Sequence, residues 1–235
     1  MERKQLDSVL LREGEQFITY LITDEKEEKS ILKLVNPEYL KYDERYEKVK
    51  EQFQFEKQLL NLLKIEGIPK YIDGGENFLH LSYISGENLK KYVKTKELTL
   101  DEIENIICSL GEIVKKLHSC RVIHCDIKPE NIIYDGEKIS LIDFGSGTFQ
   151  GEESIYIQGS NGFSAPEIYI KGMKRDIEDD TYSIAAVYHW LLSEKGYINN
   201  IKDNEIFRIG LADKREKRFK STNELISAIK KIRRE

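Results

Sequence analysis

The sequence predicts an α+β protein with two lobes: a small β-rich lobe with one helix over residues 1–84, and a larger, mainly helical lobe over residues 85–235. Two observations predict this division. Before residue 85, runs of β-branched and aromatic residues surround a single helical pattern, whereas long helical patterns dominate after it. With 235 residues, the chain is long enough to build a real core in each lobe.

The first lobe begins with strand-like runs. The stretch "QFITYLITDEKEEKSILKLV", residues 16–35, has two apolar runs around the charged turn "DEKEEK" and predicts a β-hairpin with Lys33 on its second strand. Residues 43–64 then have apolar side chains at helical spacing, namely Phe55, Leu59, Leu62 and Leu63. The segments "IPKYIDGG" and "NFLHLSYI" follow as two strands joined at a Gly-Gly turn.

Three helices are predicted for the second lobe. Residues 99–119 begin with a possible helix cap at Thr99 and have a clear apolar stripe. The segment "DDTYSIAAVYHWLL", residues 179–192, is apolar on nearly all sides, which predicts a buried helix. Residues 221–235 begin with Ser and Thr and end in basic residues, as suits a terminal helix.

The composition excludes several classes of function. Hydrophobic residues make up 40% and charged residues 34%, with a net charge of −5, so nothing favours a nucleic-acid partner. There is no apolar run of membrane-spanning length and no signal-peptide core at the N-terminus. Three cysteines without metal-ligand spacing suit free thiols in a reducing compartment. We therefore expect a cytoplasmic protein without a membrane partner.

The most informative stretch lies in the middle of the chain. The runs "NIIY" and "KISLI" flank an Asp-Gly turn, which is a strong hairpin signal. A hairpin brings the start of its first strand beside the end of its second, so Asn131 and Asp143 should meet although they are twelve positions apart. An amide oxygen and a carboxylate side by side suit Mg²⁺, which prefers oxygen ligands.

Two more polar residues precede this hairpin. Asp126 lies five residues before Asn131, where it could orient an attacking hydroxyl, and Lys128 could neutralise charge on a transferring phosphoryl group. Four such groups in this order beside apolar strands are hard to explain by structure alone. His118 and His124, by contrast, fit packed and hydrogen-bonded core histidines.

These residues fall into a known pattern. "HCDIKPEN", the "DFG" that begins twelve residues past its Asn, and the later "APE" resemble the signature set of eukaryotic-like Ser/Thr protein kinases, over almost the whole chain. The resemblance implies one compact catalytic domain with an N-lobe over residues 1–84 and a C-lobe over 85–235. It implies ATP and Mg²⁺, with Asp126 as base, Lys128 beside it, and Asn131 and Asp143 holding the metal.

The resemblance also assigns the nucleotide site. Lys33 would hold the α- and β-phosphates and pair with Glu56, although the two could by themselves be a surface pair. Adenine would lie between Ile31 and Ile133, with Leu81 as gatekeeper. The backbone of residues 82–84 would contact its edge. The full nucleotide-binding set is Leu11, Gly14, Ile31, Lys33, Glu56, Leu81, Ser82, Tyr83, Ile84 and Ile133.

Structural roles follow from the same resemblance. Leu60, Phe144 and His124 would stack as a hydrophobic column, which Ile72 could join. Asp180 would anchor the catalytic loop, and Glu167 would pair with Arg218. The chain between Leu192 and Arg218 is shorter than in most relatives, which indicates a reduced docking surface.

Two departures from the family pattern concern the loops. In "REGEQFITY" only Gly14 remains of three glycines, with Arg12 and Phe17 in the other two places, so the backbone should approach phosphates less closely. Cys125 replaces the arginine that in many relatives docks a phosphate on the activation segment, here residues 146–164. The thiol could act in redox chemistry or simply fill the arginine's space. The adjacent carboxylate would raise its pKa and favours the second interpretation.

That segment contains five hydroxyl-bearing residues, with Ser160 at a place where threonine is common. They are Thr148, Ser154, Tyr156, Ser160 and Ser164.

Three functions remain open. Lys128 two places after the base favours phosphoryl transfer to Ser or Thr, and the retained "GSNGF" and "APE" favour a protein acceptor, the chain itself included. The altered glycine loop keeps open a pseudokinase that serves as a scaffold. The short region after Leu192 keeps open a kinase for a small molecule or a specialised peptide. The sequence indicates no oligomeric state.

Overall fold

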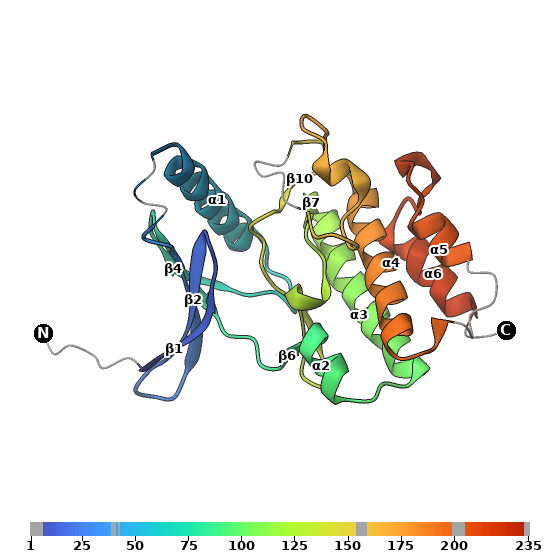
Figure 1. Ribbon diagram of the computed structural model, residues 1–235, viewed down its shortest axis with the longest axis horizontal. Coiled ribbons are helices and arrows are strands. Elements are labelled where there is room, and N and C mark those ends of the chain that lie inside the picture. Colours follow the sequence, from blue (N-terminus) through green and yellow to red (C-terminus); the bar gives the residue numbers. More distant parts are fainter. Residues whose placement is uncertain (1–6, 39–40, 42, 154–158, 199–204, 233–235) are drawn as a thin grey trace, which may run out of the picture. The chain divides into compact units, whose positions relative to one another are not determined.

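The structure is a computed structural model that describes residues 7–38, 41, 43–153, 159–198 and 205–232. The chain divides into two compact units, Met1–Lys64 with Pro69–Ile84, and Ile65–Ile68 with Ser85–Glu235 (Figure 1). The sequence placed residues 65–68 in the first lobe. They pack with the second unit because the N–H of Leu141 donates to the carbonyl of Gly67 at 2.8 Å.

The first unit contains a five-stranded antiparallel sheet in the order β1-β2-β3-β5-β4. Its strands are β1 (Asp7–Glu13), β2 (Phe17–Thr23), β3 (Lys29–Val35), β4 (Tyr71–Gly74) and β5 (Phe78–Ser82). The predicted hairpin is β2–β3, and the side chain of Asp24 closes its turn by accepting from the N–H groups of Lys26 and Glu28. The sequence did not indicate β1, since this edge strand is exposed along its whole length and has no buried face to produce alternation.

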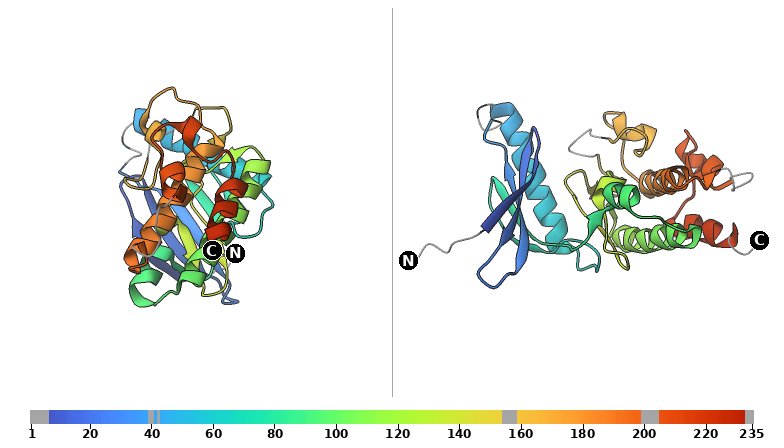
Figure 2. Two further views of the ribbon diagram at one scale, coloured as in Figure 1. Left: turned by 90° about the vertical axis from the view of Figure 1, so that its right-hand side faces the viewer. Right: turned by 60° about the horizontal axis from the view of Figure 1, so that its bottom comes forward.

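Helix α1 (Asp43–Leu62) packs against this sheet (Figures 1 and 2). The helix was predicted, but its apolar stripe was only partly right. Leu59 and Leu63 are buried as expected, whereas Leu62 is 56% exposed. The buried face is completed by Val49 and Phe53, which lie one to three turns earlier on the same side.

The second unit is built around α3 (Leu100–Ser119), which packs against both α4 (Ile177–Glu194) and α6 (Thr222–Ile232). All three predicted helices are confirmed. The cap at Thr99 is a full capping box, in which Thr99 and Glu102 each accept the other's backbone N–H. Gly111 lets α3 and α6 approach closely, because a Cβ there would collide with Ile226. The shorter helices α2 (Leu89–Thr95) and α5 (Glu205–Gly210) were not predicted.

Outside its helices, the second unit contains short strands and 3₁₀ turns. A three-stranded sheet has the order β6-β8-β9, and β7 pairs with β10. The bounds are β6 (Glu87–Asn88), β7 (Val122–Ile123), β8 (Ile132–Tyr134), β9 (Ile139–Leu141) and β10 (Thr148–Phe149), with 3₁₀ turns η2 (Pro129–Asn131), η3 (Pro166–Tyr169) and η5 (Arg215–Lys217). Within the ranges that the structure describes, no helix combines the length and apolarity needed to cross a membrane.

Candidate active site

Lys33 and Glu56 form an ion pair inside the first unit. Lys33 lies on β3 between Thr19 of β2 and Leu79 of β5, and its Nζ is 3.0 Å from Glu56 Oε2 on α1. The side chains are 12% and 2% exposed, respectively. Because water screens such a pair weakly, it holds the ammonium in one place far better than a surface pair would. The alternative of a surface charge pair is therefore wrong.

The other candidate nucleotide residues of this unit lie around the same strands. Ile31 pairs directly with Leu81 across β3 and β5, so the two apolar side chains share one face of the sheet. The N–H of Ser82 donates to the carbonyl of Lys70 at 2.9 Å, so this N–H is not offered to a nucleotide. Leu11 sits at the bulge of β1, and Gly14 in the β1–β2 turn.

Asp126 is the hydrogen-bonded centre of the loop between β7 and β8. Its Oδ2 accepts from Lys128 Nζ at 2.7 Å and from Asn131 Nδ2 at 2.9 Å, and its Oδ1 accepts from Ser160 Oγ at 2.7 Å. Lys128 Nζ also donates to Ser160 Oγ at 2.9 Å. The side chain of Asp126 is 12% exposed and is thus held in one orientation beside a cation and a hydroxyl.

The β8–β9 hairpin brings Asn131 and the start of "DFG" to the same end. Asp135 closes its turn by accepting from two backbone N–H groups, and the carbonyl of Asn131 accepts from the N–H of Ile142 at 2.9 Å, one residue before Asp143. Asn131 Nδ2 donates to Asp126, which leaves the amide oxygen as the group for a cation. Ile133 lies on β8, paired with Ser140.

A magnesium ion fits this donor set. Among the residues that the structure describes, no three His, Cys, Asp or Glu side chains gather as a metal cluster. Asn131 and Asp143 have one amide oxygen and one carboxylate as hard oxygen ligands. One or two such ligands suit Mg²⁺, because water and phosphate oxygens complete its coordination shell.

The loop that contains Asp126 is anchored by Asp180 at the start of α4. Its carboxylate accepts from the N–H groups of His124 at 2.9 Å and Cys125 at 3.0 Å, and it contacts His118 Nε2 at 2.9 Å. Burial opposes ionisation of Asp180, but these hydrogen bonds, led by that of His118, leave its pKa below the ordinary value. The anchor holds Cys125 at φ +65°, a strained conformation for this residue type.

The space around Cys125 contains an arginine that the sequence did not single out. Arg175 is 1% exposed and donates to the carbonyls of Glu167 at 2.6 Å and Ile168 at 3.0 Å. The thiol of Cys125 is 2% exposed, and burial followed by the charges of Asp180 and Asp179 raises its pKa well above the ordinary value. The thiol therefore fills space and is not poised for redox chemistry.

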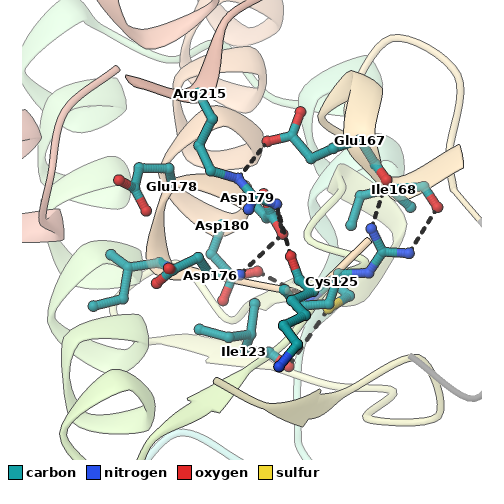
Figure 3. A network of polar contacts seen from close by, with 12 residues as sticks. Ile123, Cys125, Glu167, Ile168, Asp176, Glu178, Asp179, Asp180 and Arg215 are labelled. Atoms are coloured by element: carbon teal, nitrogen blue, oxygen red, sulfur yellow. Dashed lines mark hydrogen bonds and ion pairs between the residues drawn. The ribbon is translucent and has the colours of Figure 1, made fainter. Parts of the chain in front are cut away.

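Glu167, at the end of the loop of residues 159–167, takes part in a buried charge network (Figure 3). Both its oxygens accept from Arg218, at 2.6 and 2.8 Å, as expected. Arg215, which was not predicted, donates to Glu167 at 2.9 Å and to both oxygens of Asp179. Burial disfavours the charged form of Glu167, yet Arg218 outweighs it and lowers the pKa to about 2. Burial and the Glu167 carboxylate raise the pKa of Asp179 to about 8.

Part of the predicted hydrophobic column is present in the second unit. The rings of His124 and Phe144 meet edge to face, with centroids 4.8 Å apart. His124 is buried, which lowers its pKa and keeps the imidazole neutral, as a core histidine should be. Leu60 and Ile72 belong to the first unit. Ser154 and Tyr156 of the activation segment lie outside the described residues.

Comparison with known proteins gives one family. A family model described as "Protein kinase domain" matches residues 13–234. A dual specificity protein kinase of Dictyostelium discoideum, zakA, is 35% identical over 108 residues, which are 43% of this chain and 14% of that protein. A probable serine/threonine-protein kinase of Clostridium acetobutylicum is 28% identical over 129 residues, 52% of this chain and 20% of that protein. The chain thus spans about a fifth or less of these relatives.

A solved structure has the same fold. The kinase domain of PknI from Mycobacterium tuberculosis superimposes with a TM-score of 0.75 at 19% identity, over 96% of this chain and 94% of that one. At this identity the likeness establishes the fold, and the predicted bilobal α+β fold is confirmed.

Proposed function

Because the chain belongs to the protein kinase domain family, we propose that it transfers the γ-phosphoryl group of ATP to Ser or Thr hydroxyls of protein substrates, itself among them. In this reaction the acceptor oxygen bonds to the γ-phosphorus, the bond to the β–γ bridging oxygen breaks, and ADP leaves. The acceptor's proton passes to a carboxylate, for which we propose Asp126.

The observation that carries this proposal is the hydrogen-bonded group of Asp126, Lys128 and Ser160. Ser160 makes the contact to Asp126 Oδ1, at 2.7 Å, that an acceptor hydroxyl would need in order to be oriented and to lose its proton. Lys128 Nζ, 2.7 Å from the same carboxylate, can offset negative charge as the phosphoryl group moves.

Two further sets of residues support the nucleotide and metal roles. The ion pair with Glu56 holds the Lys33 ammonium in one place, as a group that binds the α- and β-phosphates would need to be held. Mg²⁺ bound at Asn131 and Asp143 would neutralise charge on the phosphates of ATP. Asp126 supports this role by holding the amide nitrogen of Asn131, so that the amide oxygen remains for the ion.

Incubation of the chain with Mg-ATP and a generic protein, followed by mass spectrometry, tests the proposal. We expect phosphate on Ser or Thr, and a loss of at least about 100-fold for Asp126→Asn, because a positioned general base contributes about 10²–10⁴ in rate. Asp135→Asn is the matched control, since asparagine makes the same exposed turn. An unchanged rate for Asp126→Asn sinks the assigned mechanism.

A scaffold without transfer activity is the second candidate, favoured by one observation in the β1–β2 turn. The N–H of the one remaining glycine, Gly14, donates to the carbonyl of Phe17 at 2.9 Å and is not offered to a phosphate. Thermal unfolding with Mg-ATP separates the candidates, because a ligand of the folded state raises the melting temperature. The absence of a shift at millimolar nucleotide would favour the scaffold.

A kinase for a small molecule or a specialised peptide is a third candidate. It is supported by the short helical content between α4 and Arg218, where α5, the one α-helix among the described residues, has six residues. A screen of acceptors with labelled ATP decides it: transfer to small molecules without transfer to proteins would favour this candidate.

A further inference from the structure

Phe17 stands where the family pattern has a glycine, and its ring connects the sheet to α1. The register pairs Phe17 with Val35 and Thr19 with Lys33, so Phe17 and Lys33 share one face of the sheet. The ring of Phe17 meets that of Phe53 edge to face, with centroids 5.0 Å apart and planes at 84°. Phe53 is 1% exposed and lies on α1, three residues before Glu56.

The same ring touches the catalytic lysine. Lys33 Nζ is 4.7 Å from the centroid of Phe17 and 5.9 Å from that of Phe53, while Glu56 Oε2 is 3.0 Å away. The ammonium therefore lies between a carboxylate and two aromatic faces, and both kinds of contact favour the charged group at this place. Phe17 thus contacts Lys33 on β3 and also Phe53 on α1, the helix that carries Glu56. The strand and the helix must remain together for Lys33 and Glu56 to pair.

The turn that delivers Phe17 is held by hydrogen bonds. The Gly14 N–H closes it onto the Phe17 carbonyl at 2.9 Å. Asn36, the residue after β3, donates its side-chain amide to the carbonyl of Gly14 at 3.0 Å and its N–H to the carbonyl of Gln16 at 2.8 Å. The turn is thus attached to the end of the strand that carries Lys33, unlike a loop of three glycines, which has more conformational freedom.

We propose that Phe17 is a positioning residue that holds α1 against the sheet and keeps Lys33 and Glu56 paired before any nucleotide binds. The proposal rests on the proposed function, in which this pair holds the phosphates. The proposal explains the altered glycine loop. With Phe17 in place of glycine, the backbone approaches the phosphates less closely, but Lys33 is already in position before the nucleotide binds. A ring that merely obstructs the phosphates would have the opposite effect on ATP use.

Two measurements on Phe17→Ala test the proposal, with alanine chosen because it adds less backbone freedom than glycine. We expect amide hydrogen exchange in α1 to become about tenfold faster, the size that follows from losing one aromatic pair and one cation–ring contact. We expect kcat/KM for ATP to fall by about the same factor, because the lysine must then be ordered during binding. Phe17→Tyr, which keeps the ring, should retain both values.

Tyr20→Ala is the matched control, since Tyr20 lies on the same strand but on the other face of the sheet. Phe17→Leu replaces Phe17→Ala if the latter does not fold, with smaller changes in the same direction. Unchanged exchange in α1 overturns the proposal whatever the activity, and so does faster exchange with an equal or higher kcat/KM. If the unaltered chain transfers no phosphoryl group, the proposed function fails. The comparison of hydrogen exchange still decides whether Phe17 holds α1 against the sheet.

Discussion

Ser160 donates its hydroxyl hydrogen to Asp126 Oδ1 at 2.7 Å and accepts from Lys128 Nζ at 2.9 Å. Ser160 and Asp126 are 34 positions apart: the first lies in the loop of residues 159–167, and the second lies in the loop between β7 and β8. Because of this contact, the orientation of Asp126 depends on a second loop, "GSNGFSAPE", residues 159–167. The N–H of Ser160 in turn donates to Ser164 Oγ at 2.8 Å, which fixes that loop locally.

We expect Ser160→Ala to lower kcat by about 10- to 100-fold. The variant removes a hydrogen bond to a charged group, which is worth about 1.5–3 kcal/mol, and each 1.4 kcal/mol corresponds to about tenfold in rate. Ser160→Thr keeps the hydroxyl and should retain the rate. Steady-state kinetics on one protein substrate provides the measurement. Equal kcat for the alanine and threonine variants would contradict the role assigned to this hydroxyl.

We expect Arg218→Met to lower the free energy of unfolding by about 3–5 kcal/mol, because it leaves Glu167 buried without its bidentate partner. Arg208→Met is the control, since Arg208 and Glu205 form an ion pair whose side chains are 73% and 72% exposed. Such a pair contributes little, so this variant should change stability by less than about 1 kcal/mol. Urea unfolding measures the stability of both variants. A similar loss of unfolding free energy in the two would contradict the larger contribution assigned to the buried pair.

Stability should fall on acidification because of Glu167. Arg218 overcomes the effect of burial and lowers the folded-state pKa of Glu167 to about 2, from an ordinary value of 4.5. A depressed carboxyl pKa contributes stability that is fully present above the unfolded-state value and is lost as the pH falls through the folded-state value. The loss should therefore occur between about pH 4.5 and 2 and be shallower in Glu167→Gln. Unfolding midpoints measured over this pH range for both proteins test the prediction. The same dependence on pH in the unaltered chain and in Glu167→Gln would refute the role assigned to Glu167.

The cysteines should differ in reactivity. Cys125 is 2% exposed, and burial with the nearby charges of Asp180 and Asp179 raises its pKa, whereas Cys120 is exposed. We expect iodoacetamide at pH 8 to alkylate Cys120 in the folded protein and Cys125 only after unfolding in urea, because the thiolate is the reactive species. Peptide mass spectrometry measures both. Alkylation of Cys125 at a similar rate in the folded chain would revive a redox role.

The parts of the fold that could be predicted were those with a local signal. The helix at residues 99–119 showed its apolar stripe and its cap, and the one at 179–192 showed a continuous apolar run. The Asp-Gly turn of the β8–β9 hairpin was sufficient to bring Asn131 beside the residue that precedes Asp143. The edge strand β1 had no such signal, because every residue in it is exposed. For α1 the period was visible, but which side would be buried was partly misjudged, as exposed Leu62 shows.

The sequence by itself determined the family and the set of candidate site residues, because both follow from the spacing of motifs along the chain. Only the tertiary structure revealed the charge contacts that no motif indicates. Arg175 and Arg215 have no periodic pattern, yet folding buries the first against two carbonyls and brings the second to Glu167 and Asp179. The substitution of Phe17 for a glycine was visible in the sequence, but its role depends on contacts with Lys33 and Phe53. The β2–β3 register brings Lys33 to the same face of the sheet, and only the packing of α1 brings Phe53 there.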